Sequence, residues 1–238
     1  LQIETFDPHE PYFSPERFKK PYDYDFSKFV NDWPDYRPAD DSELSKHYRM
    51  TNAALISMCD FQLGRVLDEM DRLDLWKDTM LIVNTDHGFL LGEHDWWGKC
   101  AMPFYNEIAN TPLFIWDPRC GKSGERRRSL VQTIDLPATV LEYFGIPLPQ
   151  DMQAVPLRET IKSDKPVREA ALFGIHGAQV NCTDGRYVYM RGSVPGNKPL
   201  FQYTHMPTHM RRTFSVEEMR TAEMHGPFKF TKNCPVMK

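Results

Sequence analysis

The chain has 238 residues, of which 41% are hydrophobic and 26% are charged, and it carries a formal net charge of −4 at pH 7. This length can bury the core of at least one domain. The acidic balance gives no general attraction to nucleic acid, so we exclude nucleic acid as a partner. No apolar run approaches the roughly 20 residues of a membrane-spanning helix. We expect a soluble protein without a membrane partner, and the compartment stays open between cytoplasm and periplasm.

Five cysteines are scattered along the chain without a Cys-x-x-Cys pair. This pattern argues against a structural zinc site and a disulfide framework, and it favours reduced thiols. The first residue is Leu1, and neither an initiator methionine nor a signal-like segment opens the chain. We therefore expect the chain to be the later part of a longer protein.

The N-terminal stretch is interpreted as extended up to Phe6, and it continues as Asp7-Pro8-His9-Glu10-Pro11. The two prolines stiffen the backbone around His9. From the residues alone, His9 is interpreted as an exposed loop histidine. Residues 12–40 show no periodicity, and we expect them to form a long surface loop that borders a pocket.

A helix is predicted from Asp40 to about residue 73. Asp40 can cap its first turn, with Glu43 three residues later as in a capping box. Apolar residues then recur close to the 3.6-residue period of an amphipathic helix, at Leu44, Tyr48, Leu55, Met58, Val66, Met70 and Leu73.

The stretch from Met80 to Lys99 carries most of the candidate chemistry. It begins with the short apolar run 80–83, which is typical of a buried parallel strand. Asp86 and His87 follow at the carboxyl end of that strand, where open α/β sheets bind ligands. Both side chains can bind a divalent metal. The carboxylate favours Ca²⁺, and the imidazole nitrogen leaves Mn²⁺ and Zn²⁺ as alternatives.

The loop that ends at Lys99 contains more functional side chains than a connector requires. His94, Trp96 and Trp97 are therefore candidate substrate-binding residues. Indole rings can form a stacking wall for a sugar, an aromatic group or a cation. The same two tryptophans could equally be packing residues.

Further along the chain, a second parallel strand is predicted at 113–116 and a short helix at 133–145. Short strands are expected at 170–176, 179–182 and 187–191, with Asp184-Gly185 as a hairpin turn. Ser215 and Glu218 then form a capping box at the start of another helix. We assign residues 1–164 to an α/β domain and residues 165–238 to a C-terminal subdomain. The polar groups of this subdomain are either surface residues or substrate-binding residues; they include His176, Asn181, His209 and Arg211.

Three motifs together point to a family. Residues 85–99 read T-D-H-G-F-L-L-G-E-H-D-W-W-G-K, residues 60–68 read D-F-Q-L-G-R-V-L-D, and residues 7–11 read D-P-H-E-P. In this combination the chain resembles the type I sulfatases of the alkaline phosphatase superfamily. The resemblance implies an alkaline-phosphatase-like α/β fold, with a partial mixed or parallel sheet flanked by helices and a small antiparallel C-terminal subdomain.

The resemblance also implies a reaction, the metal-dependent hydrolysis of a sulfate ester on a small molecule or a sugar. Asp86 and His87 would bind the metal, and Lys99 and His9 would be catalytic residues at the sulfate group. The family's nucleophile is a formylglycine made from cysteine. We expect it, with further metal ligands, in an upstream N-terminal segment of the same enzyme. That segment would be the chain's partner, and the chain alone would be inactive.

The segment from Cys182 to Arg186 has the spacing of a formylglycine signature, but Asp184 stands where the family requires proline or alanine. We therefore reject it as the nucleophile. Two alternative functions stay open. One is a phosphonate or phosphodiester hydrolase of the same superfamily, and the other is a non-catalytic binding fragment.

Overall fold

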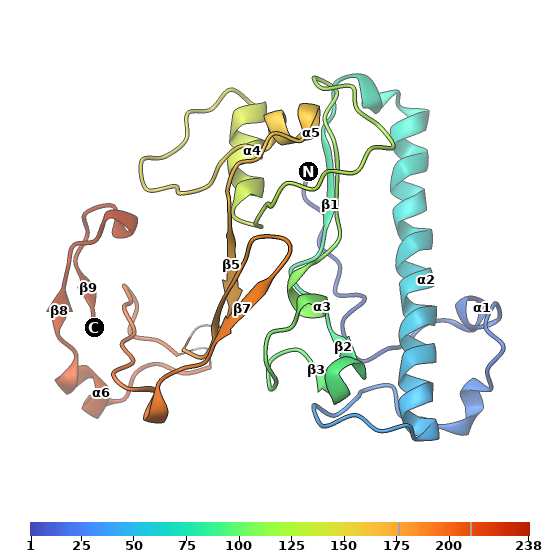
Figure 1. Ribbon diagram of the computed structural model, residues 1–238, viewed down its shortest axis with the longest axis horizontal. Helices are drawn as coiled ribbons and strands as arrows, with labels where there is room; N and C mark the ends of the chain where they lie inside the picture. Colours follow the sequence, from blue (N-terminus) through green and yellow to red (C-terminus); the bar gives the residue numbers. More distant parts are fainter. Residues whose placement is uncertain (176, 210) are drawn as a thin grey trace. The chain divides into compact units, whose positions relative to one another are not determined.

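The structure is a computed structural model that describes residues 1–175, 177–209 and 211–238 (Figure 1). The chain forms two compact units, Leu1–Arg126 and Arg127–Lys238. The domain boundary predicted between residues 164 and 165 lies within the second unit, and it stays a prediction. No helix in the described ranges is both long enough and apolar enough to cross a membrane.

The first unit is built along one long helix, α2 (Glu43–Arg72), drawn in cyan in Figure 1. Its N-cap is Ser42, whose hydroxyl accepts a hydrogen bond from the backbone of Ser45 at 3.2 Å. The prediction that Asp40 is the cap is wrong. The Asp40 carboxylate instead accepts from the hydroxyls of both serines, so it stabilises the capping residue from outside the helix.

Residues 12–40 form mostly irregular structure, as predicted. They contain only two short helical turns, α1 (Glu16–Lys19) and a 3₁₀ helix at Phe26–Lys28. The loop is attached to α2 through aromatic side chains: the ring centroids of Phe18 and Phe61 lie 5.6 Å apart. Another 3₁₀ helix at Leu75–Lys77 leads from α2 into the first strand.

The strands β1 (Leu81–Asn84) and β4 (Leu113–Trp116) lie where the sequence predicts them. They pair with each other in an antiparallel manner, with Leu81 opposite Trp116. The prediction that they are parallel is therefore wrong. An apolar run indicates that a strand is covered on both faces, but it carries no information about the direction of the neighbouring strand.

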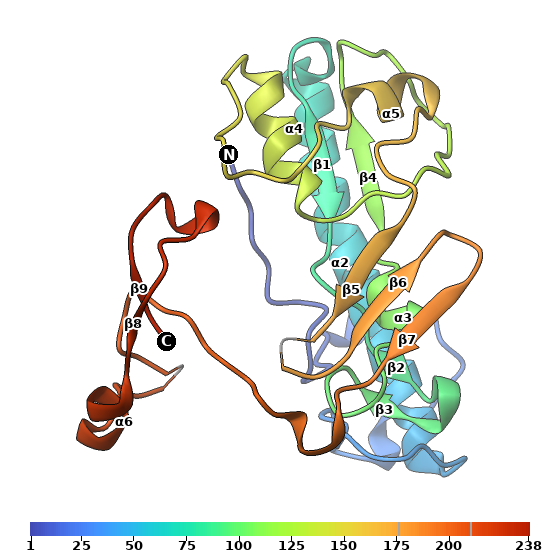
Figure 2. The ribbon, with the colours of Figure 1, turned by 60° about the vertical axis from the view of Figure 1, so that its left-hand side comes forward.

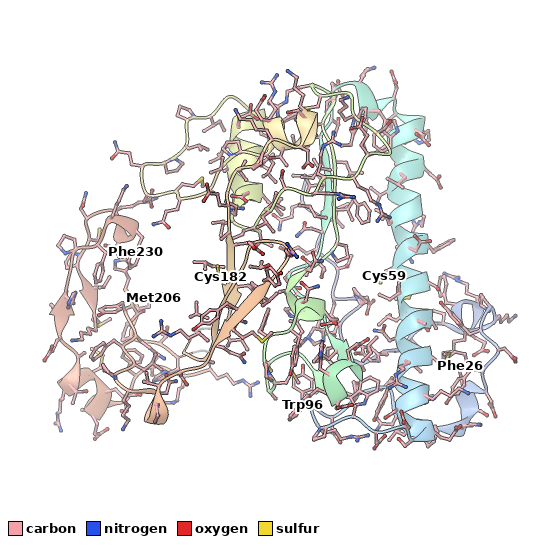
Figure 3. All side chains as sticks on the ribbon, viewed as in Figure 1. Phe26, Cys59, Trp96, Cys182, Met206 and Phe230 are labelled. Carbon is pink, nitrogen blue, oxygen red and sulfur yellow. The ribbon has the colours of Figure 1, made fainter. Side chains whose placement is uncertain are left out.

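The chain between β1 and β4 forms a small compact structure. It consists of β2 (Leu90–Leu91), a 3₁₀ helix at Glu93–Asp95, β3 (Trp97–Gly98) and α3 (Asn106–Ala109). The two strands pair antiparallel. Leu90, Met102 and Ile108 form the buried core here, with Trp96 packed against them. This core holds the loop that ends at Lys99. Figure 3 labels Trp96 in this part of the first unit.

The second unit contains α4 (Asp135–Tyr143), α5 (Arg158–Ser163) and a three-stranded antiparallel sheet in the order β5-β6-β7 (Figure 2). The strands are Ala171–Gly174, Val180–Thr183 and Val188–Arg191, close to their predicted positions. Gly185, with a φ of +88°, lies in the predicted turn between the last two.

The C-terminal part of this unit contains α6 (Val216–Thr221), whose predicted capping box of Ser215 and Glu218 is confirmed. The strands β8 (Met224–His225) and β9 (Val236–Met237) pair antiparallel. Two 3₁₀ helices complete the unit, at Pro195–Asn197 and Lys229–Thr231.

A buried carboxylate in the first turn of α4 joins three segments of the second unit. Asp135 is 0% exposed, and Arg168 binds both of its oxygens, with Nη2 2.7 Å from Oδ1. The backbone N–H groups of Gln132 and Val155 donate to the same carboxylate at 2.8 and 3.1 Å. Burial raises the pKa of Asp135, but the hydrogen bonds from Arg168 and the two amides outweigh it. The pKa therefore lies below its usual value.

We expect Arg168→Met to lower the free energy of unfolding by about 3–5 kcal/mol, because the buried carboxylate would lose its partner. Urea denaturation of the purified protein measures the change. Arg220→Met on the exposed side of α6 is the control and should stay within about 0.5 kcal/mol of the wild type. Equal effects of the two substitutions would contradict the assignment.

The contribution of this ion pair should depend on pH. Since the folded pKa of Asp135 is lowered, the stabilisation is complete above the unfolded pKa of about 3.9 and is lost as the pH falls through the folded value. The difference in unfolding free energy between wild type and Asp135→Asn should therefore be largest near pH 7 and shrink towards pH 3. Denaturation curves at several pH values test this. A difference that grows on acidification would show that the sign is wrong.

Candidate functional site

The predicted metal ligands lie directly after β1. Asp86 Oδ2 and His87 Nε2 are 3.5 Å apart, so one ion could contact both atoms. The Asp86 carboxylate also accepts a hydrogen bond from the backbone N–H of His87 at 2.9 Å. His87 Nδ1 lies 3.0 Å from the carbonyl oxygen of Gly88. Because a carbonyl only accepts, Nδ1 is the donor in this contact, and in the tautomer protonated only at Nδ1 a lone pair remains on Nε2.

This pair has the chemistry of half a metal site. A metal-binding histidine commonly donates its other ring N–H to a carbonyl, as His87 does. The Asp86 side chain is 83% exposed, which leaves its oxygens accessible to a cation. Within the described residues, however, no group of three or more His, Cys, Asp or Glu side chains is placed to hold a metal ion. Two donors fall short of the 6–8 oxygens that Ca²⁺ takes.

The predicted catalytic residues contact each other, although 90 positions separate them in the sequence. Lys99 Nζ lies 2.7 Å from His9 Nε2. The lysine follows β3, whereas the histidine lies in the proline-flanked N-terminal stretch. Two separate loops therefore bring these residues together, while their catalytic roles, and a site shared with Asp86 and His87, stay predictions.

A third residue completes this contact, and sequence reasoning missed it. Glu10 is 2% exposed; its Oε2 lies 3.3 Å from Lys99 Nζ, and its Oε1 accepts a hydrogen bond from the Tyr36 hydroxyl at 2.5 Å. Burial raises the pKa of Glu10, but the Tyr36 hydrogen bond and the nearby charge of Lys99 outweigh it and lower the pKa. Its position beside His9 was the only available signal, because a glutamate between prolines is usually exposed.

Close packing holds Tyr36 against the backbone that carries Lys99. Gly98 has a φ of +127°, and a Cβ added there would lie 2.9 Å from Tyr36 Cγ. Only glycine allows this backbone conformation and so close an approach. Phe89, two residues after His87, packs edge-on against Tyr36 with ring centroids 5.7 Å apart. Phe89 therefore connects the loop that carries Asp86 and His87 to Tyr36, the hydrogen-bond partner of Glu10.

Three candidate substrate residues lie in the same unit, and their contacts differ. His94 is exposed; its Nε2 lies 2.9 Å from Glu107, and its ring stacks on Tyr105 at 3.9 Å. Trp96 is half-buried against the small core. Trp97 is 0% exposed, a placement that favours the packing role for this residue. Substrate binding by the three residues stays a prediction.

The other candidates belong to the second unit. Asn181 is fully buried on β6, and Arg211 is exposed. His209 Nε2 lies 2.6 Å from Glu218 Oε1. Hydrogen bonds from the Ser215 backbone, Arg212 and His209 lower the pKa of Glu218 to about 2. His176 lies outside the described residues. Substrate binding by these four residues also stays a prediction.

The family was identified by comparison with known proteins. A family model described as Sulfatase matches residues 1–146. The N-acetylglucosamine-6-O-sulfatase of Bacteroides thetaiotaomicron is 28% identical over 119 residues, which are 50% of this chain and 21% of that protein. Human arylsulfatase K is 32% identical over 146 residues, with 58% of this chain and 27% of its own length covered. The chain thus spans about a fifth to a quarter of the length of these relatives.

Solved structures show the same fold. A phosphonate monoester hydrolase from Silicibacter pomeroyi aligns with a TM-score of 0.61 and 21% identity, over 78% of this chain and 46% of that one. A protein in complex with its substrate D-glucosamine-2-N,6-O-disulfate aligns with a TM-score of 0.55 and 22% identity, over 61% and 32% of the two chains. These likenesses support the alkaline-phosphatase-like fold class predicted from the sequence. Because the family model covers more than half of the residues, the chain belongs to the sulfatase family.

Proposed function

We propose that this chain supplies part of the active site of an enzyme that hydrolyses sulfate esters. The observation that carries the proposal is the contact of Lys99 Nζ with His9 Nε2 at 2.7 Å. It joins the Gly-Lys end of the longest sulfatase-like motif to the histidine of the D-P-H-E-P motif. Membership of the sulfatase family supports the same reaction class.

In this proposal Lys99 binds the sulfate group of the substrate, and His9 is the second catalytic residue beside it, with Nε2 accepting a hydrogen bond from the lysine. The ammonium of Lys99 donates hydrogen bonds to sulfate oxygens and neutralises the negative charge that accumulates during S–O bond cleavage. A positive charge that is already in position lowers the barrier more than one that must reorganise. The Lys99 side chain is only 14% exposed, so water screens its charge little.

We further propose that Asp86 and His87 are two ligands of a divalent cation, with Ca²⁺ favoured by the carboxylate and Mn²⁺ or Zn²⁺ as alternatives. The bound ion would polarise the sulfate oxygens as a Lewis acid. The remaining ligands, and a formylglycine that provides the attacking hydroxyl, would come from an N-terminal segment outside these 238 residues. The small share of the relatives' length that the chain covers is consistent with such a segment.

A second candidate reaction is the hydrolysis of a phosphonate ester or a phosphodiester. It is supported by the structural likeness to the Silicibacter pomeroyi phosphonate monoester hydrolase. Sulfate and phosphonate esters both present anionic, roughly tetrahedral groups to a lysine and a metal, so the described site fits either. For the organic part of the substrate we propose a sugar or an aryl group, as the names of the relatives suggest.

Lys99→Ala should lower kcat for an aryl sulfate by roughly 10²–10³-fold in the intact enzyme, which is the scale for the loss of one preorganised charge stabiliser. Lys165→Ala replaces an exposed lysine of the second unit, and this control should leave kcat unchanged. Steady-state kinetics with an aryl sulfate and an aryl phosphonate compare the two reactions. A loss below about threefold for both substrates would remove Lys99 from the site.

Asp86→Ala and His87→Ala should each reduce the metal content of the intact enzyme, because each removes one donor of the pair. Elemental analysis after dialysis measures the bound metal without reference to turnover. Asp68→Ala on the exposed side of α2 is the matched control. Unchanged metal content in both ligand variants would mean that the pair binds no metal.

A further inference from the structure

The ammonium of Lys99 makes two hydrogen bonds to other described residues. It carries three N–H donors and no acceptor. One N–H is used by His9 Nε2 at 2.7 Å and a second by Glu10 Oε2 at 3.3 Å. The third N–H has no partner among the described residues. The direction of this third donor is set by the two partners, since a tetrahedral ammonium with two bonds fixed has no rotation left.

The same geometry decides the protonation of His9. Its Nδ1 lies 2.5 Å from the backbone carbonyl oxygen of Glu10, so Nδ1 must donate. Its Nε2 faces the lysine ammonium at 2.7 Å, and two donors cannot face each other at that distance. His9 is therefore neutral, with the proton on Nδ1 and a lone pair on Nε2.

The Glu10 carboxylate is itself held in place. Tyr36 donates to Oε1 at 2.5 Å, and Tyr36 lies against the backbone of Gly98, the residue before Lys99. The Glu10 side chain is 3% exposed, so it lies below the surface where a substrate would bind. A buried carboxylate with an unpaired oxygen would be costly, and this one has a partner at each oxygen.

We infer that Glu10 is a positioning residue: anchored by Tyr36, it holds the Lys99 ammonium beside His9 Nε2 and so directs the remaining N–H of the lysine at the substrate. Glu10 itself does not touch the substrate in this arrangement. The positioning role depends on the proposed function only in the kinetic test, because the contacts of Glu10 lie within the protein itself.

The kinetic test is a double-mutant cycle in the intact enzyme with an aryl sulfate. Glu10→Gln keeps the shape of the side chain but removes its charge. It should lower kcat by about 10–10²-fold, the scale for a misplaced catalytic group, and change KM less than threefold. In the Lys99→Ala background the same substitution should cost less than about twofold, because Glu10 acts through Lys99. Equal losses in both backgrounds would overturn the inference. The exposed Glu16→Gln is the control.

Tyr36→Phe separates the anchor from the charge. It removes the hydroxyl that donates to Glu10 but keeps the negative charge of the carboxylate. We expect a loss in kcat, smaller than that of Glu10→Gln, which again nearly vanishes when Lys99 is alanine. A loss in kcat that persists at full size without Lys99 would show that Tyr36 acts on the general fold.

A second test needs no substrate. The ¹⁵N resonances of the His9 ring in the resting protein should show a protonated Nδ1 and an unprotonated Nε2. The Nε2 resonance should shift in Lys99→Ala and in Glu10→Gln, and it should not shift in Glu16→Gln. A protonated Nε2, or one insensitive to Glu10→Gln, would refute the positioning role. If the enzyme hydrolyses neither a sulfate nor a phosphonate ester, the proposed function is wrong. The ¹⁵N measurement still tests whether Glu10 positions Lys99 beside His9.

Discussion

The ion pair between Glu10 and Lys99 is the interaction on which the arrangement of the first unit's site depends. A buried carboxylate is stable only when its oxygens are paired, and Glu10 pairs with a residue 26 positions away and another 89 positions away. The hydrogen bonds that pair the Glu10 carboxylate therefore bring the N-terminal stretch, the long irregular loop and the end of β3 together. The backbone conformation at Gly98 follows from the same requirement, because the Tyr36 ring lies where a side chain would otherwise be.

The Lys99 ammonium and the Asp86 carboxylate of the candidate site have opposite surroundings, and each suits the role proposed for it. Lys99 is largely buried with an anion beneath it, whereas Asp86 is exposed. A buried lysine with fixed partners has its charge in place before the substrate arrives. An exposed carboxylate beside an imidazole lone pair can turn to meet a cation. Phe89, two residues after His87, packs edge-on against both Tyr36 and Tyr12.

The second unit also contains a buried, paired carboxylate, and its role there is structural. Asp135 is as deeply buried as Glu10, but its partners are Arg168 and two backbone amides, all at short distances. The carboxylate is saturated with donors, and nothing is left to direct at a ligand. The comparison shows why burial of a charge alone does not mark a functional residue. Asp135 is paired within the fold by Arg168 and two backbone amides, whereas Glu10 is paired with a lysine of the candidate site.

The sequence by itself determined the features that depend on neighbouring residues: the strands at 81–84 and 113–116, the long helix, the Asp184-Gly185 turn and the capping box at Ser215. Its motifs also selected Lys99 and His9 before their contact was seen. Tertiary structure alone decided the antiparallel pairing of β1 with β4, the burial of Trp97 and the position of Glu10. Each of these depends on which distant segment lies opposite, and a local pattern records only that a residue is apolar or charged. A glutamate between two prolines has the same local signature whether water or a lysine 89 residues away is its partner.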